Sequence, residues 1–338
     1  MIDLLDRQLL FVSGKGGTGK TSIAAAIAEL AVRCGKRTLV CEMDAKGALA
    51  AAFDVRELTF EPSEVQPGLF GMVMNTEDSL KEYLRLFIRI PLVGRIGPLA
   101  RTFDFVADAA PGVKEILAIG KLCHEVRERH YDLVVVDAEA SGHIVAQIDA
   151  PRAIRELVQV GMVRDQTDWM LEILGDAQRT GLVVVATPEE MPVTETIELV
   201  DKVRTTTDVD VAAVIANRVL PQWFSAADTK VFQALLEPAA QTALAAAAGP
   251  KVTTVFEAAS LAQARREVAV GYLDRLREGV PSTVPLVLVP ELFTRSGGRR
   301  VVSLLADALH DEIGGADPDR GPDPDSGPTG RSSAKGRR

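Results

Sequence analysis

A glycine-rich segment near the start of the chain combines residue types that suit phosphate binding. Residues 14–21 read Gly-Lys-Gly-Gly-Thr-Gly-Lys-Thr and fit the spacing G-x-x-x-x-G-K-S/T. Glycine lets a backbone adopt conformations that a Cβ would block, so its N–H groups can approach phosphate oxygens. We expect Lys20 to reach the β- and γ-phosphates of ATP and the Thr21 hydroxyl to ligate Mg²⁺. The predicted nucleotide-binding residues of this segment are Gly14, Lys15, Gly16, Gly17, Thr18, Gly19, Lys20, Thr21 and Ser22.

The elements around this segment are those that a phosphate-binding loop needs. Gln8 to Ser13 is a short apolar run typical of a buried strand, and Thr21 to Val32 is an alanine-rich run typical of a helix. A loop between a strand and a helix N-terminus places bound phosphate at the positive end of the helix dipole. A glycine-rich turn formed by chance would not need either neighbour, so the sequence predicts a nucleotide site.

The rest of the chain alternates short Val/Ile/Leu-rich runs with longer helical stretches. This pattern predicts an α/β fold, a mostly parallel doubly wound sheet with helices on both faces. Residues 77–130 and 152–179 break the alternation and predict a helical insertion subdomain, and the alanine-rich residues 225–277 predict helices packed beside the sheet. We expect one domain over residues 1–313, with a disordered Pro/Gly/Asp tail over 314–338. The further strands are expected at residues 37–43, 68–75, 132–137, 181–186, 209–216 and 285–289.

The composition narrows the class of protein. The 338 residues carry a net charge of −9, which argues against a nonspecific nucleic-acid binder. No apolar run approaches the roughly 18 residues that span a bilayer, and Asp3 and Asp6 argue against a signal peptide. The three cysteines, which lack CxxC spacing, suit a reducing cytoplasm and argue against a thiolate zinc site.

Asp137 follows the apolar run of residues 133–136 and is the expected end of a strand. A carboxylate in this place is typical of the residue that holds Mg²⁺, directly or through water, opposite a phosphate-binding loop. Because a phosphate-binding loop needs such a partner, we predict that Thr21 and Asp137 form the metal site.

Lys15 adds a second lysine directly after the first glycine. The resulting G-K-G-G-x-G-K-S/T resembles the deviant Walker A group, which includes MinD and ParA, nitrogenase iron protein, and the arsenite-pump and tail-anchored-protein-targeting ATPases. In that group the lysine crosses a dimer interface to the partner's nucleotide, where it acts as an arginine finger does. The resemblance implies a catalytic Lys15 and a homodimer, or a heterodimer with a paralogous ATPase. A solvated loop lysine is the alternative.

Two further segments resemble the arsenite-pump and tail-anchored-targeting branch of that group. Residues 137–143 resemble its switch II signature D-T-A-P-T-G-H, which makes Ser141, Gly142 and His143 switch II candidates, although Glu139 and Ala140 depart from it. Residues 44–53 resemble its switch I motif D-P-A-H-x-L-x-D-A-F. The resemblance gives Asp44 the catalytic role of orienting the attacking water; a helix N-cap is the alternative.

Three fragments extend this resemblance to near residue 300. Residues 110–115 resemble the P-G-x-x-E step of the helical insertion, and residues 187–196 resemble the segment P-E-x-x-x-x-x-E-T. The resemblance makes Asn217 a reader of adenine through its side-chain amide, with Pro290, Glu291 and Leu292 on the other side of the base. Asn217 and Pro290 could equally be plain strand terminators.

The resemblance implies a cytoplasmic, Mg²⁺-dependent ATPase switch of the single-domain actinobacterial type, with slow turnover. ATP binding and hydrolysis would open and close a helical surface toward a hydrophobic helical client or a membrane-protein partner. Arsenite and zinc are not expected, because the cysteines that relatives use for them are missing. The alternatives are a weakly catalytic regulatory partner of a paralogous ATPase, a ParA/MinD-like positioning ATPase, and a ligase or kinase on the same fold.

Overall fold

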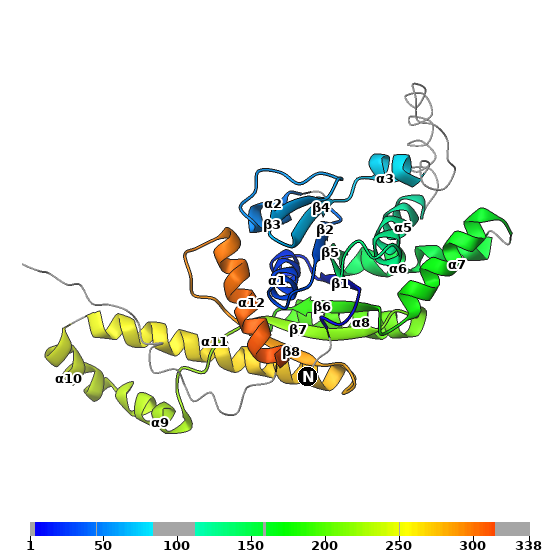
Figure 1. The fold of residues 1–338 in the computed structure, drawn as a ribbon. Coiled ribbons are helices and arrows are strands. Elements are labelled where there is room, and N and C mark those ends of the chain that lie inside the picture. The colour runs from blue at the N-terminus through cyan, green and yellow to red at the C-terminus, as the bar shows by residue number, and fades with distance from the viewer. Residues whose placement is uncertain (1–3, 45, 84–111, 158–159, 250, 315–338) are drawn as a thin grey trace, which may run out of the picture.

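The computed structural model describes residues 4–44, 46–83, 112–157, 160–249 and 251–314 (Figure 1). Parts of three regions named above lie outside these residues: residues 84–111 of the predicted helical insertion, which include the first two residues of the 110–115 fragment, and residues 315–338 of the tail.

The described residues form one sheet of eight strands in the order β3-β4-β2-β5-β1-β6-β7-β8. Only β3 pairs antiparallel, with β4, and every other pair is parallel. The predicted α/β fold with a mostly parallel, doubly wound sheet is therefore confirmed. The strands are β1 (Leu9–Gly14), β2 (Thr38–Glu42), β3 (Ser63–Gln66), β4 (Leu69–Val73), β5 (Leu133–Ala140), β6 (Thr180–Ala186), β7 (Val211–Val219) and β8 (Leu286–Pro290).

Side chains of successive strand residues point to opposite faces, and helices cover both. Leu9 and Phe11 belong to one core, and Leu10 and Val12 to the other. The first core is closed by α5 (Val113–Arg127), α6 (Ser141–Leu157), α7 (Met162–Gly175) and α8 (Glu190–Thr206). The second is closed by α1 (Lys20–Arg33), α2 (Ala48–Ala52) and α12 (Gly298–Gly314).

The two expected helical stretches lie together on the first face (Figure 1). The hydroxyl of Tyr83, at the end of α3 (Thr76–Tyr83), donates to Gln166 Oε1 of α7 at 2.6 Å. A buried ion pair, Lys121 with Glu125 at 2.6 Å, lies within α5. The second stretch begins earlier than predicted, because α6 starts at Ser141 rather than near Arg152.

The alanine-rich region consists of α9 (Ala226–Leu235), α10 (Pro238–Ala248) and α11 (Lys251–Gly279). The prediction that it packs beside the sheet is right only for the last part of α11, where Ala269, Leu273 and Leu276 are buried. α9, α10 and the start of α11 project away from the sheet (Figure 1). None of the described helices is both long and apolar enough to cross a membrane.

Candidate active site

The glycine-rich loop leaves β1 at Gly14, in the middle of the sheet. Gly14 has φ 145°, and a Cβ on it would lie 2.1 Å from the backbone oxygen of Val185 in β6, so no larger residue fits there. Gly19, with φ 94°, caps α1. Between them the loop folds around the Lys15 carbonyl, which accepts from Thr18 Oγ1 at 2.9 Å and from Lys20 Nζ at 3.3 Å.

Thr21 and Asp137, predicted as metal ligands, are in direct contact. Thr21 Oγ1 donates to Asp137 Oδ2 at 2.6 Å, and Asp137 Oδ1 is buried without a hydrogen-bond partner among the described residues. Burial raises the pKa of Asp137 to about 6, against the opposing hydrogen bond from Thr21 and the charge of Lys20. A hydroxyl beside a carboxylate oxygen that lacks a partner is the hard donor set that Mg²⁺ prefers, so these residues fit the ion.

Asp137 does not end its strand as predicted. β5 continues to Ala140, which pairs with Gly14, and Ser13 Oγ donates to the Glu139 carbonyl at 2.8 Å. The apolar pattern stops at Asp137, but backbone pairing with β1 continues because it does not depend on side-chain type.

Lys15 is held within its own chain. Its amine forms an ion pair with Glu195 Oε1 of α8, and Ser141 Oγ donates to Glu195 Oε2 at 3.0 Å. The hydrogen bond from Lys15 is the main cause that lowers the pKa of Glu195. Glu195 thus connects the glycine-rich loop with the first turn of α6. Glu195 belongs to the segment 187–196, which resembles P-E-x-x-x-x-x-E-T, but that resemblance implied no role for it.

The switch II candidates Ser141, Gly142 and His143 form the first turn of α6. The side chain of His143 is 76% exposed, and its Nδ1 lies 4.0 Å from Glu139 Oε2. Of the three, the structure connects Ser141 to the loop lysine, through Glu195, while His143 faces solvent.

Asp44 is exposed and lies near the glycine-rich loop. Its carboxylate pairs with Lys46 and contributes to the electrostatic environment of Lys20. Burial lowers the pKa of the Lys20 amine, while the Asp137 and Asp44 carboxylates act in the opposite direction. Asp44 therefore lies close enough to the glycine-rich loop to affect the pKa of Lys20, while its own carboxylate is paired with Lys46.

The alternative that Asp44 caps the next helix is wrong. The N-cap of α2 is Gly47, with φ 74°, and its first N–H groups are satisfied by Glu42. The Glu42 carboxylate, 2% exposed, accepts from the backbone N–H groups of Lys46, Ala48 and Leu49 at 2.9, 3.1 and 3.1 Å. The sequence did not predict a role for Glu42. A charged residue directly after the apolar residues Val40 and Cys41 could have indicated one.

Asn217 lies inside β7, which continues to Val219 rather than ending at residue 216 as predicted. Its side chain is buried, Nδ2 donates to the Thr18 carbonyl at 2.8 Å, and Oδ1 accepts from the Arg218 N–H at 2.9 Å. The amide that was expected to read adenine thus binds the glycine-rich loop. The adenine-reading role of Asn217 stays a prediction. The alternative of a plain strand terminator is wrong for Asn217, because β7 continues through it to Val219.

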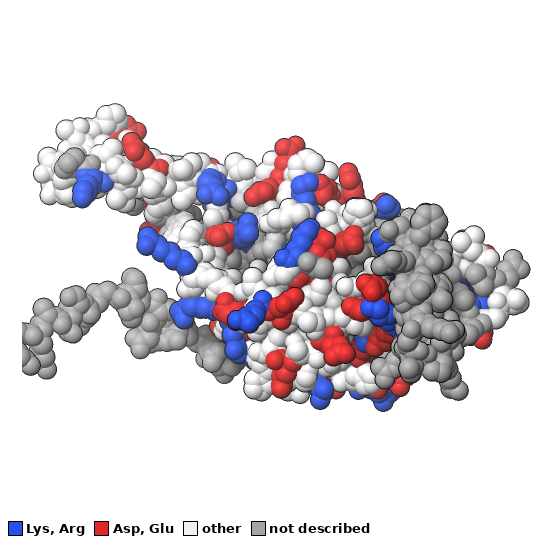
Figure 2. Space-filling model, turned by 90° about the horizontal axis from the view of Figure 1, so that it is seen from above, with Lys and Arg blue, Asp and Glu red and all other residues white. Residues whose placement is uncertain are grey.

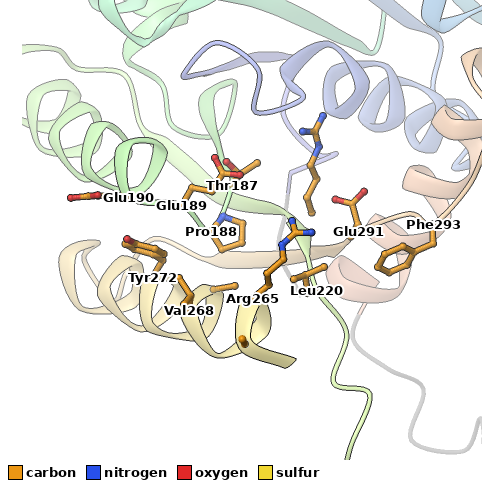
Figure 3. A pocket seen from close by; sticks show the side chains of 13 residues that line it. Thr187, Pro188, Glu189, Glu190, Leu220, Arg265, Val268, Tyr272, Glu291 and Phe293 are labelled. Carbon is orange, nitrogen blue, oxygen red and sulfur yellow. The ribbon is translucent and has the colours of Figure 1, made fainter. Parts of the chain in front are cut away.

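A cavity of about 740 Å³ lies at the carboxyl ends of β6, β7 and β8 (Figure 3). Its walls are the segment after β6, the loop after β8, and α11. Of the three residues predicted beside adenine, Glu291 lines this cavity, Pro290 is exposed, and Leu292 packs against the core. Arg265 and Tyr272 of α11 also line it, and no motif had pointed to them.

The loop, the predicted metal ligands Thr21 and Asp137, and the cavity all lie at the carboxyl edge of one mostly parallel sheet, the usual place for a ligand in such folds. The family model described as anion-transporting ATPase matches residues 7–167 and 155–241, more than half of the chain.

Several relatives bear related names. A Mycobacterium tuberculosis protein named ATPase BagA is 30% identical over 225 residues, 63% of this chain and 66% of that protein. A putative arsenical pump-driving ATPase of Halobacterium salinarum is 24% identical over 66% of this chain and 37% of its own length. An ATPase ASNA1 homolog of Paramecium tetraurelia is 23% identical over 64% of this chain and 78% of its own. The match thus spans just under two thirds of the mycobacterial relative, and the family model shows that the chain belongs to the anion-transporting ATPase family.

Proposed function

We propose that the chain is a Mg²⁺-dependent ATPase that works as a dimeric switch. The observation that carries this proposal is the Thr21–Asp137 contact, which lies within reach of the Lys20 charge and in which Asp137 Oδ1 has no hydrogen-bond partner among the described residues. A phosphate site and a metal site are thereby joined at one helix N-terminus. The names of the relatives support hydrolysis of ATP.

Each residue has a defined part in this proposal. The loop N–H groups and Lys20 bind the phosphates, and Thr21 and Asp137 would hold the ion, which neutralises phosphate charge when bound. Asp44 orients the attacking water after it leaves Lys46. Lys15 leaves Glu195 and crosses to the nucleotide of the partner subunit, where it stabilises negative charge. The base lies along the cavity that Glu291 lines, with ATP as the nucleotide.

The test is steady-state ATP hydrolysis with Mg²⁺, with light scattering for mass. Lys15→Ala and Asp44→Asn are expected to abolish turnover while ATP still binds, and Lys202→Ala, an exposed lysine of α8, is the matched control. Full turnover in Lys15→Ala would refute the role of the loop lysine, and full turnover in Asp44→Asn would refute that of Asp44.

The Asp44–Lys46 pair favours a second candidate, a regulatory partner that binds ATP but turns it over only weakly. The switch I motif has alanine where this chain has Lys46, so Lys46→Ala frees Asp44. An increase in turnover in this variant would support occlusion of Asp44 by Lys46. Binding without turnover in both proteins would favour a regulatory partner of a paralogous ATPase.

The proposed partners are a second subunit and a hydrophobic helical client or membrane-protein partner, in the cytoplasm. We place the client surface on the helical insertion over 77–130. A role for arsenite or zinc is not part of the proposal, because Cys41 and Cys123 lie in the core. Burial raises the pKa of the Cys123 thiol to about 12, which disfavours the thiolate that either ligand needs.

A further inference from the structure

The region that projects from the sheet, residues 221–268, is here called the arm. Of the ten large apolar side chains that are exposed in the described residues, six lie on the arm. They are Trp223, Val231, Leu236, Val255, Leu261 and Val268. So strong a concentration of exposed apolar side chains marks an interaction surface.

An apolar groove lies between α9 and α11. It encloses about 460 Å³, and its walls include Val231, Leu235, Val255 and Ala259. A stack of three rings supports it: Phe224 on Phe232 with centroids 4.7 Å apart, and Phe232 on Phe256 at 5.5 Å. The stack ties the two helices together, so the groove is preformed.

The neighbouring helix α10 is only partly packed: it contacts α11 and α9 of its own chain, and Leu244 is half-buried. It has eleven residues, seven of them alanine, and none of the eleven, all of them described, is buried. Helices of this length are marginal in water unless an apolar face packs against something. The arm therefore contains both an apolar helix that its own chain covers only in part and an apolar groove that no residue of α10 lines.

The distribution of charge indicates which molecule covers α10 and the groove. The chain has a net charge of −9, so two copies repel each other over most of their surface. The arm has none of this excess, since four basic residues balance four acidic ones. The lobe that projects at the left of Figure 2, in the place of the arm, is mostly uncharged on the face shown. The arm is thus the place where two copies can meet with least repulsion.

We propose that the arm pairs two copies of this chain, with α10 of each copy in the groove between α9 and α11 of the other. A two-fold axis makes such a contact with one patch used twice, and it covers both helices and both grooves. The contact involves no residue of the glycine-rich loop and needs no nucleotide. It is therefore separate from the dimer proposed across Lys15.

Sedimentation velocity of the full chain without nucleotide, at micromolar concentration, tests the pairing. Wild type and Lys15→Ala are expected to be dimers. Val255→Glu in the groove and Ala247→Glu, at an exposed position of α10, are each expected to raise the dimer Kd by at least about 30-fold, as for an interface hot spot. Thr254→Glu adds the same charge to an exposed residue of α11 that does not line the groove, and it is expected to stay dimeric.

Two further measurements separate a lost contact from a misfolded arm. Circular dichroism checks that each variant keeps the helix content of wild type. Val231→Glu serves as a second groove variant in case Val255→Glu fails to fold. A chain with Ala247→Cys and a chain with Val255→Cys, both in a Cys34→Ser background, are expected to form a disulfide between chains when they are mixed. A monomeric wild type without nucleotide, or equal masses in all arm variants, would overturn the proposal. A monomer whose groove binds a synthetic amphipathic helix would assign the groove to a client instead.

Discussion

Asn217 provides the sharpest test of how the site is held. Its Nδ2 donates to the Thr18 carbonyl, and its Oδ1 accepts from the Arg218 N–H. Asn217→Ala removes both contacts. Asn217→Asp has nearly the same shape and keeps the acceptor, but it turns an oxygen toward the Thr18 carbonyl. We expect both changes to weaken nucleotide binding, Asn217→Asp more than Asn217→Ala.

The size of the effect follows from burial. Asn217 is only 4% exposed, so water cannot replace the lost donor at Thr18. An unsatisfied buried carbonyl costs about 1–3 kcal/mol. If this cost falls on the loop conformation that binds phosphate, the Kd for ATP rises between about 5-fold and about 150-fold. Asn217→Asp adds the cost of a buried charge beside a carbonyl, and its Kd should rise further.

Calorimetric titration with ATP and with tripolyphosphate separates support of the loop from recognition of the base. A side chain that supports the loop affects both ligands by the same factor, because tripolyphosphate needs the loop and has no base. A loss confined to ATP would refute this reasoning and would assign the Asn217 amide to adenine.

Three other changes test the fold. Gly14→Ala places a Cβ against the Val185 backbone at a positive φ and is expected to cost at least about 3 kcal/mol in urea unfolding, whereas Gly16→Ala, with open space around its Cβ, is expected to be nearly neutral. Lys121→Met leaves Glu125 buried without its main partner and is expected to cost about 3–5 kcal/mol in the same assay; an unchanged midpoint would contradict the ion pair. Burial would raise the pKa of Glu125, but the contacts with Lys121 and other partners outweigh it and lower the pKa below 4.5. Because the folded pKa is depressed, this contribution to stability is full above pH 4.5 and is lost as the pH falls through the folded pKa. Thermal unfolding of Glu125→Gln should accordingly depend less on pH in that range than wild type.

The sequence predicted the parts of the fold that carry strong side-chain signals. Strands that are largely buried are continuous apolar runs, so β1, β2, β4, β5, β6, β7 and β8 were all expected. β3 was missed, because an edge strand that reads Ser-Glu-Val-Gln and is partly exposed has little apolar signal. The ends of β5 and β7 were placed too early because polar residues can continue a ladder that backbone groups form.

In the candidate site, the motifs predicted that Thr21 and Asp137 lie together, but not the side chains that hold the surrounding loops. Glu195 acts through contacts with segments distant in the sequence, and Glu42 through backbone N–H groups, and no short motif records such contacts. The alanine-rich stretch shows a similar limit. Alanine favours a helix whether or not it is buried, so the pattern predicted α9 and α10 without indicating that they leave the sheet.

The strand order also determines when a nascent chain can bind nucleotide. β1 is made early, but its two neighbours are β5 and β6, and Leu9 pairs with Val134 on one side and Thr180 on the other. Contacts so distant in sequence form late, because a long segment must first be closed into a loop. Until about half of the chain has left the ribosome, the glycine-rich loop lacks both Asp137 and the β6 backbone that Gly14 packs against. A chain interrupted before β6 therefore carries the full glycine-rich motif without the assembled site. If the proposed function holds, ATP can stabilise only products synthesised beyond β6.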